Sequence, residues 1–304
     1  MSWRRALKGV VFDIKRFAVH DGPGIRSSVF TKGCALRCEW CQNPEGLENK
    51  INLWYFESRC IQCHKCIDVC PEKALSFGKS GEPHILIDKN KCNNCGDCTQ
   101  HCPTRALAFD SRLMSVDEVM DELIEDRAFY ESSGGGITLT GGDPMFQHQF
   151  NLEILKQCRK EKLHTAIETS MFVGNEIFKK FINLVDLFIV DIKTFDSQLH
   201  QNFTGFKNSL IKTNFEMIAA ENVDILVRIP MIPGFTDTEK NIKDIAAYVH
   251  SLKSDIRIEL LNFNPLARDK YHLMNQDYKM ENDHRVFSEA AMNRFNSIIT
   301  SVSK

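Results

Sequence analysis

Short runs of apolar, often β-branched residues alternate along this chain with longer segments in which apolar residues recur at helical spacing. The short runs predict strands at 27–32, 137–140, 164–169, 187–193, 224–230 and 256–263. The helical spacing predicts helices over 115–131, 147–161, 175–183, 208–221 and 239–253, with a closing helix near 284–301. We expect capping boxes at the starts of two of these helices, Ser115–Glu118 and Thr236–Glu239.

The order of these elements predicts an α/β fold. Six β/α units with nearly continuous apolar strands indicate a parallel sheet covered by helices, and right-handed crossovers then curl it into a barrel or partial barrel. In such folds the loops after the carboxyl ends of the strands form the active site. The first strand leads directly into KGCALRCEWCQNPE, residues 32–45, so we expect the chemistry there.

Charge and hydropathy exclude several classes of partner. The chain has 304 residues and a formal net charge of −2, without a long block of one sign, so nothing indicates binding to nucleic acid or to an anionic membrane. The first residues contain no signal-peptide core, and the longest apolar run, near Leu187–Val190, is far too short to span a bilayer. We expect a monomeric protein of the cytoplasm.

The cysteines locate the chemistry. Twelve are present, and eleven of them fall into three short runs, which in an intracellular chain favours metal or redox chemistry over disulfides. The twelfth, Cys158, follows Ile154 by one turn on the apolar face of a predicted helix, so we expect a buried core residue.

The second and third runs, CIQCHKCIDVCP and CNNCGDCTQHCP, have the C-x2-C-x2-C-x3-C-P spacing of bacterial ferredoxins. In those proteins the fourth cysteine of each run crosses to the other cluster. If it does so here, one 4Fe-4S cluster is held by Cys60, Cys63, Cys66 and Cys102, and the other by Cys92, Cys95, Cys98 and Cys70. Structural zinc sites are the alternative, although zinc prefers two separated C-x2-C pairs. We expect that His64 and His101, which lie within these runs, do not bind the clusters.

These runs define a domain organisation. Residues 52–110 are expected to form a ferredoxin-like domain with two clusters, inserted into a barrel made of residues 1–51 and 111–304. The insert can relay electrons, dock a partner or stabilise a lobe, and relay is our working hypothesis.

The first run places Cys34, Cys38 and Cys41 within eight positions and supplies no fourth partner nearby. Three cysteines can ligate three irons of a cubane and leave the fourth iron open to an exogenous ligand. A three-cysteine zinc site and unconnected core cysteines are the alternatives.

The C-x3-C-x2-C spacing, with Trp40 before the last cysteine, resembles the signature of the radical S-adenosylmethionine (radical SAM) enzymes. The resemblance implies that the open iron binds the amino and carboxylate groups of S-adenosylmethionine. It also implies that an electron from the reduced cluster cleaves the sulfonium to give methionine and a 5'-deoxyadenosyl radical, which abstracts a hydrogen atom.

Further motifs resemble one family of these enzymes. FAVHDGPGIRSSVFTKGC, GGGITLTGGDP, AIETS, VDIK and VRIPMIPGF occur in the order found in the activating enzymes of glycyl radical enzymes. The resemblance runs from about Val10 to Phe263 and implies a partial (β/α)6 barrel. The implied reaction removes a hydrogen atom from a glycine Cα of a partner enzyme. The insert is similar to that of activators of glycerol or diol dehydratases, decarboxylases and carbon–sulfur or carbon–nitrogen lyases.

The resemblance also implies functions for single residues around S-adenosylmethionine. Gly141, Gly142 and Asp143 match the motif that receives its amino group, with Asp143 where the family usually has Glu. The other implied cofactor contacts are Trp40, Glu168, Thr169, Asp191, Lys193, Arg228 and Asn264. Lys193 would offer a cation to the carboxylate, and the acids would help to place the ligand or a monovalent cation. Asn264 stands where the family often has histidine.

Segment 20–26, HDGPGIR, matches the family segment near the glycine loop of the partner, which implies partner contacts for Asp21, Gly22 and Arg26. A reduced ferredoxin or flavodoxin is the expected electron donor. Two other functions stay open: a radical SAM enzyme that acts on a small molecule, and an electron-transfer iron–sulfur protein with an inactive barrel.

Overall fold

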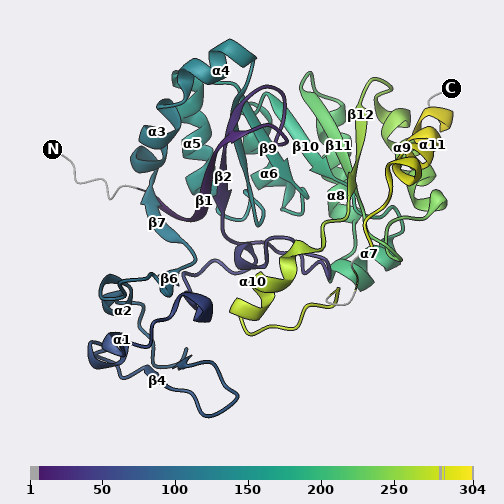
Figure 1. Cartoon of the computed structure of the whole chain (residues 1–304). Coiled ribbons are helices and arrows are strands. Elements are labelled where there is room, and N and C mark those ends of the chain that lie inside the picture. The colour runs from purple at the N-terminus through teal and green to yellow at the C-terminus, as the bar shows by residue number, and fades with distance from the viewer. Residues whose placement is uncertain (1–6, 281–282, 284, 303–304) are drawn as a thin grey trace.

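An eight-stranded sheet forms the centre of the computed structural model, which describes residues 7–280, 283 and 285–302 (Figure 1). The strand order is β12-β11-β10-β9-β8-β2-β1-β7. All six predicted strands are present, adjacent and parallel: β2 Arg26–Thr31, β8 Gly136–Gly141, β9 Thr165–Thr169, β10 Leu187–Asp191, β11 Asp224–Met231 and β12 Arg257–Asn262. Because β12 and β7 are free edges, the sheet is an open, partial barrel, and the predicted fold class is confirmed.

The predicted helices pack on one face of this sheet. They are α3 Val116–Ile124, α4 Arg127–Ser133, α5 His148–Lys160, α6 Asn175–Ile182, α8 Ser209–Ala219, α9 Glu239–Leu252 and α11 Glu289–Val302. Strand side chains alternate between the two faces: Phe188 and Val190 join the large core under the helices, whereas Ile189 joins a small cluster on the inner face. Cys158 is fully buried in the large core, as predicted. None of the helices in the described part of the chain combines the length and apolar character that a membrane span requires.

Helix starts agree with the sequence at one of the two expected capping boxes. At α3 the Glu118 amide donates to Ser115 Oγ (3.2 Å), and the Ser115 amide donates to the Glu118 carboxylate (2.6 Å). The box at Thr236 is wrong: α9 is capped by Thr238, whose Oγ1 accepts from the Asn241 amide, while Thr236 is buried in the preceding turn.

The predicted helix 115–131 is broken near Asp126, which separates α3 from α4. The Asp126 carboxylate accepts hydrogen bonds from Arg16 Nε (2.7 Å) and Ser27 Oγ (2.8 Å). These contacts come from the first two strands, so helical periodicity alone could not reveal them.

Four strands and helices of the barrel were not predicted. Strands β1 (Lys8–Ala18) and β7 (Arg112–Ser115) extend the sheet antiparallel at the edge beside β2, and both are partly exposed, which weakens their apolar signal. Helices α7 (Ser197–Thr204) and α10 (Arg268–Leu273) are too short to show a clear period. The first part of the predicted closing helix includes residue 284, which lies outside the described residues.

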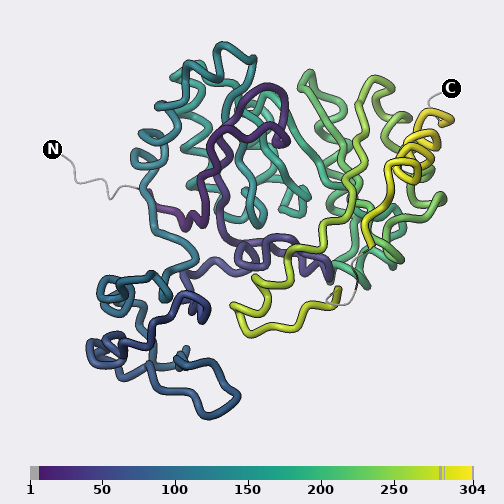
Figure 2. The backbone as a smooth tube through the Cα atoms, viewed as in Figure 1, coloured from purple at the N-terminus to yellow at the C-terminus, as the bar shows by residue number. Residues whose placement is uncertain are grey.

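The insert projects from one end of the sheet as a separate lobe (Figure 2). It contains the antiparallel pairs β3 (Leu53–Tyr55) with β6 (Leu107–Phe109) and β4 (Leu75–Phe77) with β5 (Ile85–Ile87), and the short helices α1 (Lys65–Asp68) and α2 (Asp97–Gln100). It has its own apolar core. The Asn52 amide donates to Asp110 Oδ1 (3.0 Å), and the Asp110 amide donates to the Asn52 carbonyl (3.0 Å), so we keep 52–110 as the proposed extent of this domain.

Candidate functional site

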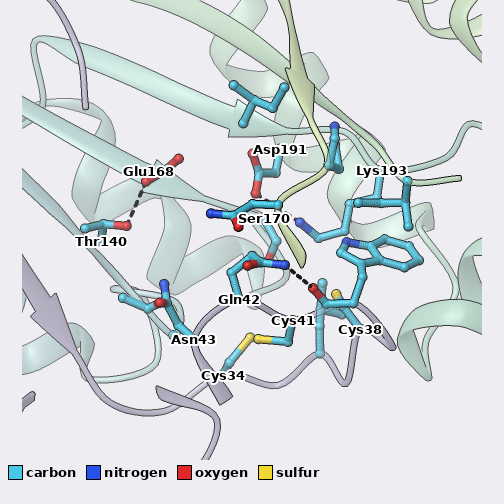
Figure 3. Close-up of a pocket in the computed structure, with 18 of the residues that line it drawn as sticks. Cys34, Cys38, Cys41, Gln42, Asn43, Thr140, Glu168, Ser170, Asp191 and Lys193 are labelled. Atoms are coloured by element: carbon cyan, nitrogen blue, oxygen red, sulfur yellow. Dashed lines mark hydrogen bonds and ion pairs between the residues drawn. The ribbon is translucent and has the colours of Figure 1, made fainter. Parts of the chain in front are cut away.

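The loop that follows β2 carries Cys34, Cys38 and Cys41 to the carboxyl ends of the neighbouring strands, where all three line one cavity of about 260 Å3. Figure 3 shows the three cysteines on one side of this cavity and Asp191 and Lys193 on the other. This is the strand end at which the sequence predicts the chemistry.

Backbone hydrogen bonds hold this loop against the rest of the barrel. The Cys34 amide donates to the Leu47 carbonyl (3.1 Å), and the Arg37 amide donates to the Thr204 carbonyl at the end of α7 (2.8 Å). The Arg37 guanidinium also donates to the Cys34 carbonyl (2.5 Å). The positions of the three thiols are therefore set by segments far apart in the sequence.

Gly141 and Gly142, which also line the cavity, let the end of β8 approach this loop closely. Gly141 has φ +118°, and a Cβ there would lie 2.5 Å from the Thr31 carbonyl oxygen. A Cβ on Gly142 would lie 2.3 Å from the Gly46 carbonyl oxygen. These glycines are thus required by backbone packing, whatever they contact in the cavity.

Burial makes the three thiols poor anions on their own. It raises the pKa of Cys34 and Cys38, and it raises the pKa of Cys41 to about 12. Repulsion from neighbouring thiolates of the run contributes to the shifts of Cys34 and Cys41. Because metal ligands bind as thiolates, these buried sulfurs fit a cationic iron cluster that compensates their charge.

Asp191 and Lys193 face the cysteines across the cavity. Lys193 Nζ lies 3.0 Å from Asp191 Oδ2 and is almost fully buried. Although burial opposes its charge, the Asp191 carboxylate and the Cys38 sulfur raise the Lys193 pKa overall. Asp191 Oδ1 is buried without a hydrogen-bond partner among the described residues, so one acceptor of this pair is left for a ligand.

Glu168 lines the same cavity from the end of β9, and its carboxylate accepts from Thr140 Oγ1 (2.8 Å). Burial raises the Glu168 pKa, the Asp191 carboxylate raises it further, and Arg228 opposes the shift. Arg228 itself does not line the cavity: it pairs with Glu168 (2.7 Å) and Glu259 (2.9 Å) and donates to the His20 carbonyl. Its contacts identify it as a residue that positions Glu168.

Asp143 lies behind the cavity wall. Its buried carboxylate accepts from Thr169 Oγ1 (2.9 Å), Ser170 Oγ (2.6 Å) and the Ser170 amide (3.0 Å). Burial raises the pKa of Asp143, and these hydrogen bonds oppose that shift. Thr169 and Ser170 line the cavity and Asp143 does not, so Asp143 fixes the wall through them.

The segment after β12 closes the cavity from another side. Trp40 lines the cavity and lies in one apolar cluster with Phe263 and Tyr271. Asn264 also lines the cavity, and its Oδ1 accepts from the Leu266 amide (3.0 Å). Sequence analysis assigned no function to residues 265–280. Lys270 Nζ nevertheless contacts three groups of the cysteine loop: the Gln42 carbonyl (3.1 Å), Asn43 Oδ1 (3.2 Å) and Glu45 Oε1 (2.6 Å).

Ser170, Gln42 and Asn43 are cavity residues that the sequence analysis missed. Each lies within two positions of a predicted site residue, and that proximity is the only sequence signal for them. No sequence signal marked Lys270, since its contacts span more than 220 positions.

The residues of the predicted partner segment differ in their exposure to solvent. Arg26 is completely buried, and its guanidinium donates to Thr138 Oγ1 (2.7 Å) and the Ile137 carbonyl (2.6 Å). It therefore holds the 20–26 turn and has no surface for a partner, which corrects the expectation for this residue. Asp21 and Gly22 are partly exposed and stay predicted partner contacts.

The insert brings its eight cysteines together in two groups. Cys60, Cys63, Cys66 and Cys102 line one cavity, and Cys70, Cys92, Cys95 and Cys98 line a second. Each group therefore combines three cysteines of one run with the fourth of the other, which is the crossed arrangement. Burial, together with repulsion from thiolates of its own group, raises the pKa of Cys98 to about 12.

Within the described residues, no three His, Cys, Asp or Glu side chains converge tightly enough to hold a single metal ion. A zinc ion needs sulfur ligands at about 2.3 Å. Each of the three cysteine groups lines a cavity.

Comparisons with known proteins agree with this site. Residues 89–246, more than half of the chain, match the Radical SAM superfamily, and residues 59–106 match the 4Fe-4S dicluster domain. The (2S)-3-sulfopropanediol dehydratase activating enzyme of Klebsiella oxytoca is 37% identical, covering 90% of this chain and 88% of that protein. The benzylsuccinate synthase activating enzyme of Thauera aromatica is 39% identical, covering 88% and 82%. The 4-hydroxyphenylacetate decarboxylase activating enzyme of Clostridioides difficile (strain 630) is 37% identical, covering 92% and 89%.

These relatives extend over nearly the whole chain, insert included, and all are activating enzymes. The protein therefore belongs to the radical SAM superfamily and, within it, to the activating enzymes of glycyl radical enzymes.

Proposed function

We propose that this protein activates a glycyl radical enzyme by using S-adenosylmethionine bound in the cavity beside Cys34, Cys38 and Cys41. One observation carries the proposal: the buried Cys34 and the partly buried Cys38 and Cys41 face a buried lysine and an unpaired carboxylate oxygen across a single cavity. When bound and reduced, a 4Fe-4S cluster with an open iron supplies the electron that cleaves S-adenosylmethionine, and the resulting 5'-deoxyadenosyl radical takes a hydrogen atom from a glycine Cα of the partner.

The residues around the cavity would bind and orient S-adenosylmethionine and would not exchange protons with it. Lys193, held cationic by Asp191, would pair with the ligand carboxylate. Asp191 Oδ1 and the Glu168 carboxylate would accept from the amino and hydroxyl groups of the ligand or help to hold a monovalent cation. Thr169, Gly141, Gly142, Asn264 and Trp40 also line the cavity, and Trp40 belongs to an apolar cluster beside it.

Asp143 and Arg228 do not line the cavity and act through residues that do. Asp143 fixes Thr169 and Ser170, and Arg228 fixes Glu168. The family usually has Glu at the Asp143 position. The shorter carboxylate is fully engaged by the cavity wall in this chain, which supports a positioning function.

The insert would hold two further 4Fe-4S clusters and relay electrons from a reduced ferredoxin or flavodoxin to the cysteine loop. The two cysteine-lined cavities support this part of the proposal. The partner is a glycyl radical enzyme. The similar relatives activate partners with different reactions at 37–39% identity, so identity favours no single partner. A monomeric state is part of the proposal as well.

The test is an anaerobic assay of the reconstituted protein with dithionite and S-adenosylmethionine, in which 5'-deoxyadenosine and iron are measured together. We expect about twelve iron atoms per chain, from three cubanes of four, and formation of 5'-deoxyadenosine. Cys38→Ala should abolish cleavage. Cys158→Ala, which removes a buried thiol outside the proposed ligand sets, is the matched control. A fully loaded protein that forms no 5'-deoxyadenosine would favour an electron-transfer protein instead.

The protein partner is tested by electron paramagnetic resonance. Incubation with candidate glycyl radical enzymes, S-adenosylmethionine and reductant should produce a glycyl radical signal with one of them. Cleavage without a signal from any such enzyme, but with conversion of a small molecule, would favour the small-molecule alternative.

A further inference from the structure

The two cysteine groups of the insert lie beside different positions along the β3–β6 strand pair. In the β3–β6 ladder, Leu53 faces Phe109 and Tyr55 faces Leu107. Leu53 and Phe109 line the cavity of Cys70, Cys92, Cys95 and Cys98, here called the proximal cavity. Tyr55 and Leu107 line the cavity of Cys60, Cys63, Cys66 and Cys102, here called the distal cavity. Two residues of a strand separate these levels by roughly 7 Å.

The Leu53–Phe109 end is the end attached to the barrel. Its neighbours Asn52 and Asp110 pair with each other, and Lys32 Nζ lies 2.6 Å from Asp110 Oδ2, with both side chains fully buried. Lys32 stands two residues before Cys34. The barrel side of the insert is therefore fixed next to the loop that carries the radical-site cysteines.

A second contact ties the proximal cavity to the same point. Asn94, which lines this cavity between Cys92 and Cys95, donates through Nδ2 to the Ile51 carbonyl (3.1 Å). The adjacent Lys50 carbonyl accepts from Lys32 Nζ (2.7 Å). A short path of bonded and hydrogen-bonded groups thus joins the proximal cavity to the start of the cysteine loop.

The distal cavity lies toward the other end of the insert. Figure 1 shows α1, which carries Cys66 of the distal cavity, further from the sheet than α2, which carries Cys98 of the proximal cavity. Cys63 is exposed there, and Ile61 and Phe77 are more than half exposed. The Tyr55 hydroxyl is buried beside the Cys60 sulfur, so a tyrosine of β3 faces the cysteines of this cavity.

We propose that the insert is a directional relay in which electrons enter at the distal cavity, pass to the proximal cavity and then reach the site at Cys34, Cys38 and Cys41. This rests on the proposed function and adds the order of the sites. One electron leaves a reduced one-electron carrier protein, crosses the two insert sites in turn and is consumed in breaking the sulfonium carbon–sulfur bond of S-adenosylmethionine. The carrier is oxidised by one electron for each cleavage.

Direct reduction of the proximal site is the rival order, because Cys95 is exposed as well. The two orders differ in which cysteine group a carrier protein needs. If electrons enter at the proximal site, the distal group is dispensable for reduction by the carrier.

The first test measures which insert site lies nearer to the radical site, and it does not depend on enzymatic activity. In the reduced, fully loaded protein, the electron paramagnetic resonance signal of the cluster at Cys34, Cys38 and Cys41 should be broadened by its nearer neighbour. We expect Cys95→Ala to remove this broadening and Cys63→Ala to leave it. Loss of the broadening in Cys63→Ala, with retention in Cys95→Ala, would reverse the proposed order.

The second test measures how fast a reduced ferredoxin-type carrier reduces the radical site, compared with dithionite. Both cysteine variants should lose reduction by the carrier while reduction by dithionite persists. If Cys63→Ala keeps the wild-type rate with the carrier, the proposal is wrong, because electrons then bypass the distal site.

Because loss of a cysteine can also cause misfolding, a third variant keeps every thiol and changes only the surface at the distal end. Phe77→Glu, at the exposed distal end, should lower the second-order rate constant with the carrier about tenfold, the effect of losing one aromatic interface contact. The matched control is Leu113→Glu, which changes an equally exposed apolar residue on β7 of the barrel. Equal effects of the two variants would contradict electron entrance at the distal end. Failure of the wild type to form 5'-deoxyadenosine with dithionite would count against the proposed function and leave the order readable from the line broadening.

Discussion

Lys32→Met should detach the base of the insert from the barrel. Lys32 Nζ contacts Asp110 Oδ2 at 2.6 Å and the Lys50 carbonyl at 2.7 Å, and neither charged side chain is accessible to solvent. The substitution leaves Asp110 as a buried carboxylate whose remaining donors are Asn52 and Ser111. Removing one partner of such a pair costs about 3–5 kcal/mol, because the other charge stays buried without compensation.

This cost is large against the ~5–15 kcal/mol by which a whole domain is stabilised. Its effect should be local, because the pair joins the insert to the barrel and lies outside both cores. Native-state hydrogen exchange is the suitable assay, since a protein with an inserted domain does not guarantee two-state unfolding. Exchange at the Asn52 and Asp110 amides should accelerate strongly, while exchange in the barrel strands should change little.

The control is Lys50→Met, which breaks the nearby exposed ion pair with Glu48 and should cost no more than about 1 kcal/mol. Lys32→Met combined with Asp110→Asn should cost less than the sum of the single changes, because no buried charge is left behind. If Lys32→Met accelerates exchange no more than Lys50→Met does, the buried pair does not hold the insert in place, and the argument for the domain boundary at 52–110 fails.

Three further predictions follow from the site. Gly142→Ala should prevent close packing of β8 on the cysteine loop, because its Cβ would lie 2.3 Å from the Gly46 carbonyl oxygen; a variant with wild-type iron content and cofactor affinity would contradict this. Lys270→Met should speed chelator removal of iron from the barrel site and spare the insert, measured against Lys279→Met, an exposed pair with Glu39; equal rates in both variants would refute it. Burial lowers the pKa of His200 in the folded protein, whereas in the unfolded chain it is about 6.5. The unfolded chain therefore binds the proton more readily, and stability should fall as pH drops below that value. The melting temperatures at about pH 7.5 and 5.5 should converge in His200→Asn, and an unchanged pH dependence in this variant would exclude the explanation.

Much of the chemistry could be predicted from the sequence because cluster ligands are encoded by local spacing. The three cysteine runs place their thiols within one or two turns of a loop, so the runs could be identified without tertiary information. The parallel strands could be predicted as well, because a strand buried on both faces has a nearly continuous apolar sequence. For the same reason the partly exposed β1 and β7 were missed, since their apolar positions are interrupted.

Spatial relations at the site were decided by the tertiary structure. Arg26 and Asp21 belong to one short motif, yet Arg26 is fully buried by residues of β8 and Asp21 is not. Asp143 follows a glycine pair that lines the cavity, yet its carboxylate turns to Thr169 and Ser170. The direction of a side chain depends on what packs around it, and those neighbours lie far away in the sequence.

Ligand type and spacing are local properties of the chain, so the sequence was sufficient to predict which side chains carry the chemistry. Tertiary structure alone decided how the sites are ordered. The buried pair of Lys32 with Asp110 joins residues 78 positions apart, and Lys270 reaches the cysteine loop from more than 220 positions away. Such contacts form only when the sheet and its insert are assembled, because burial and long-range packing, rather than local periodicity, bring those groups together.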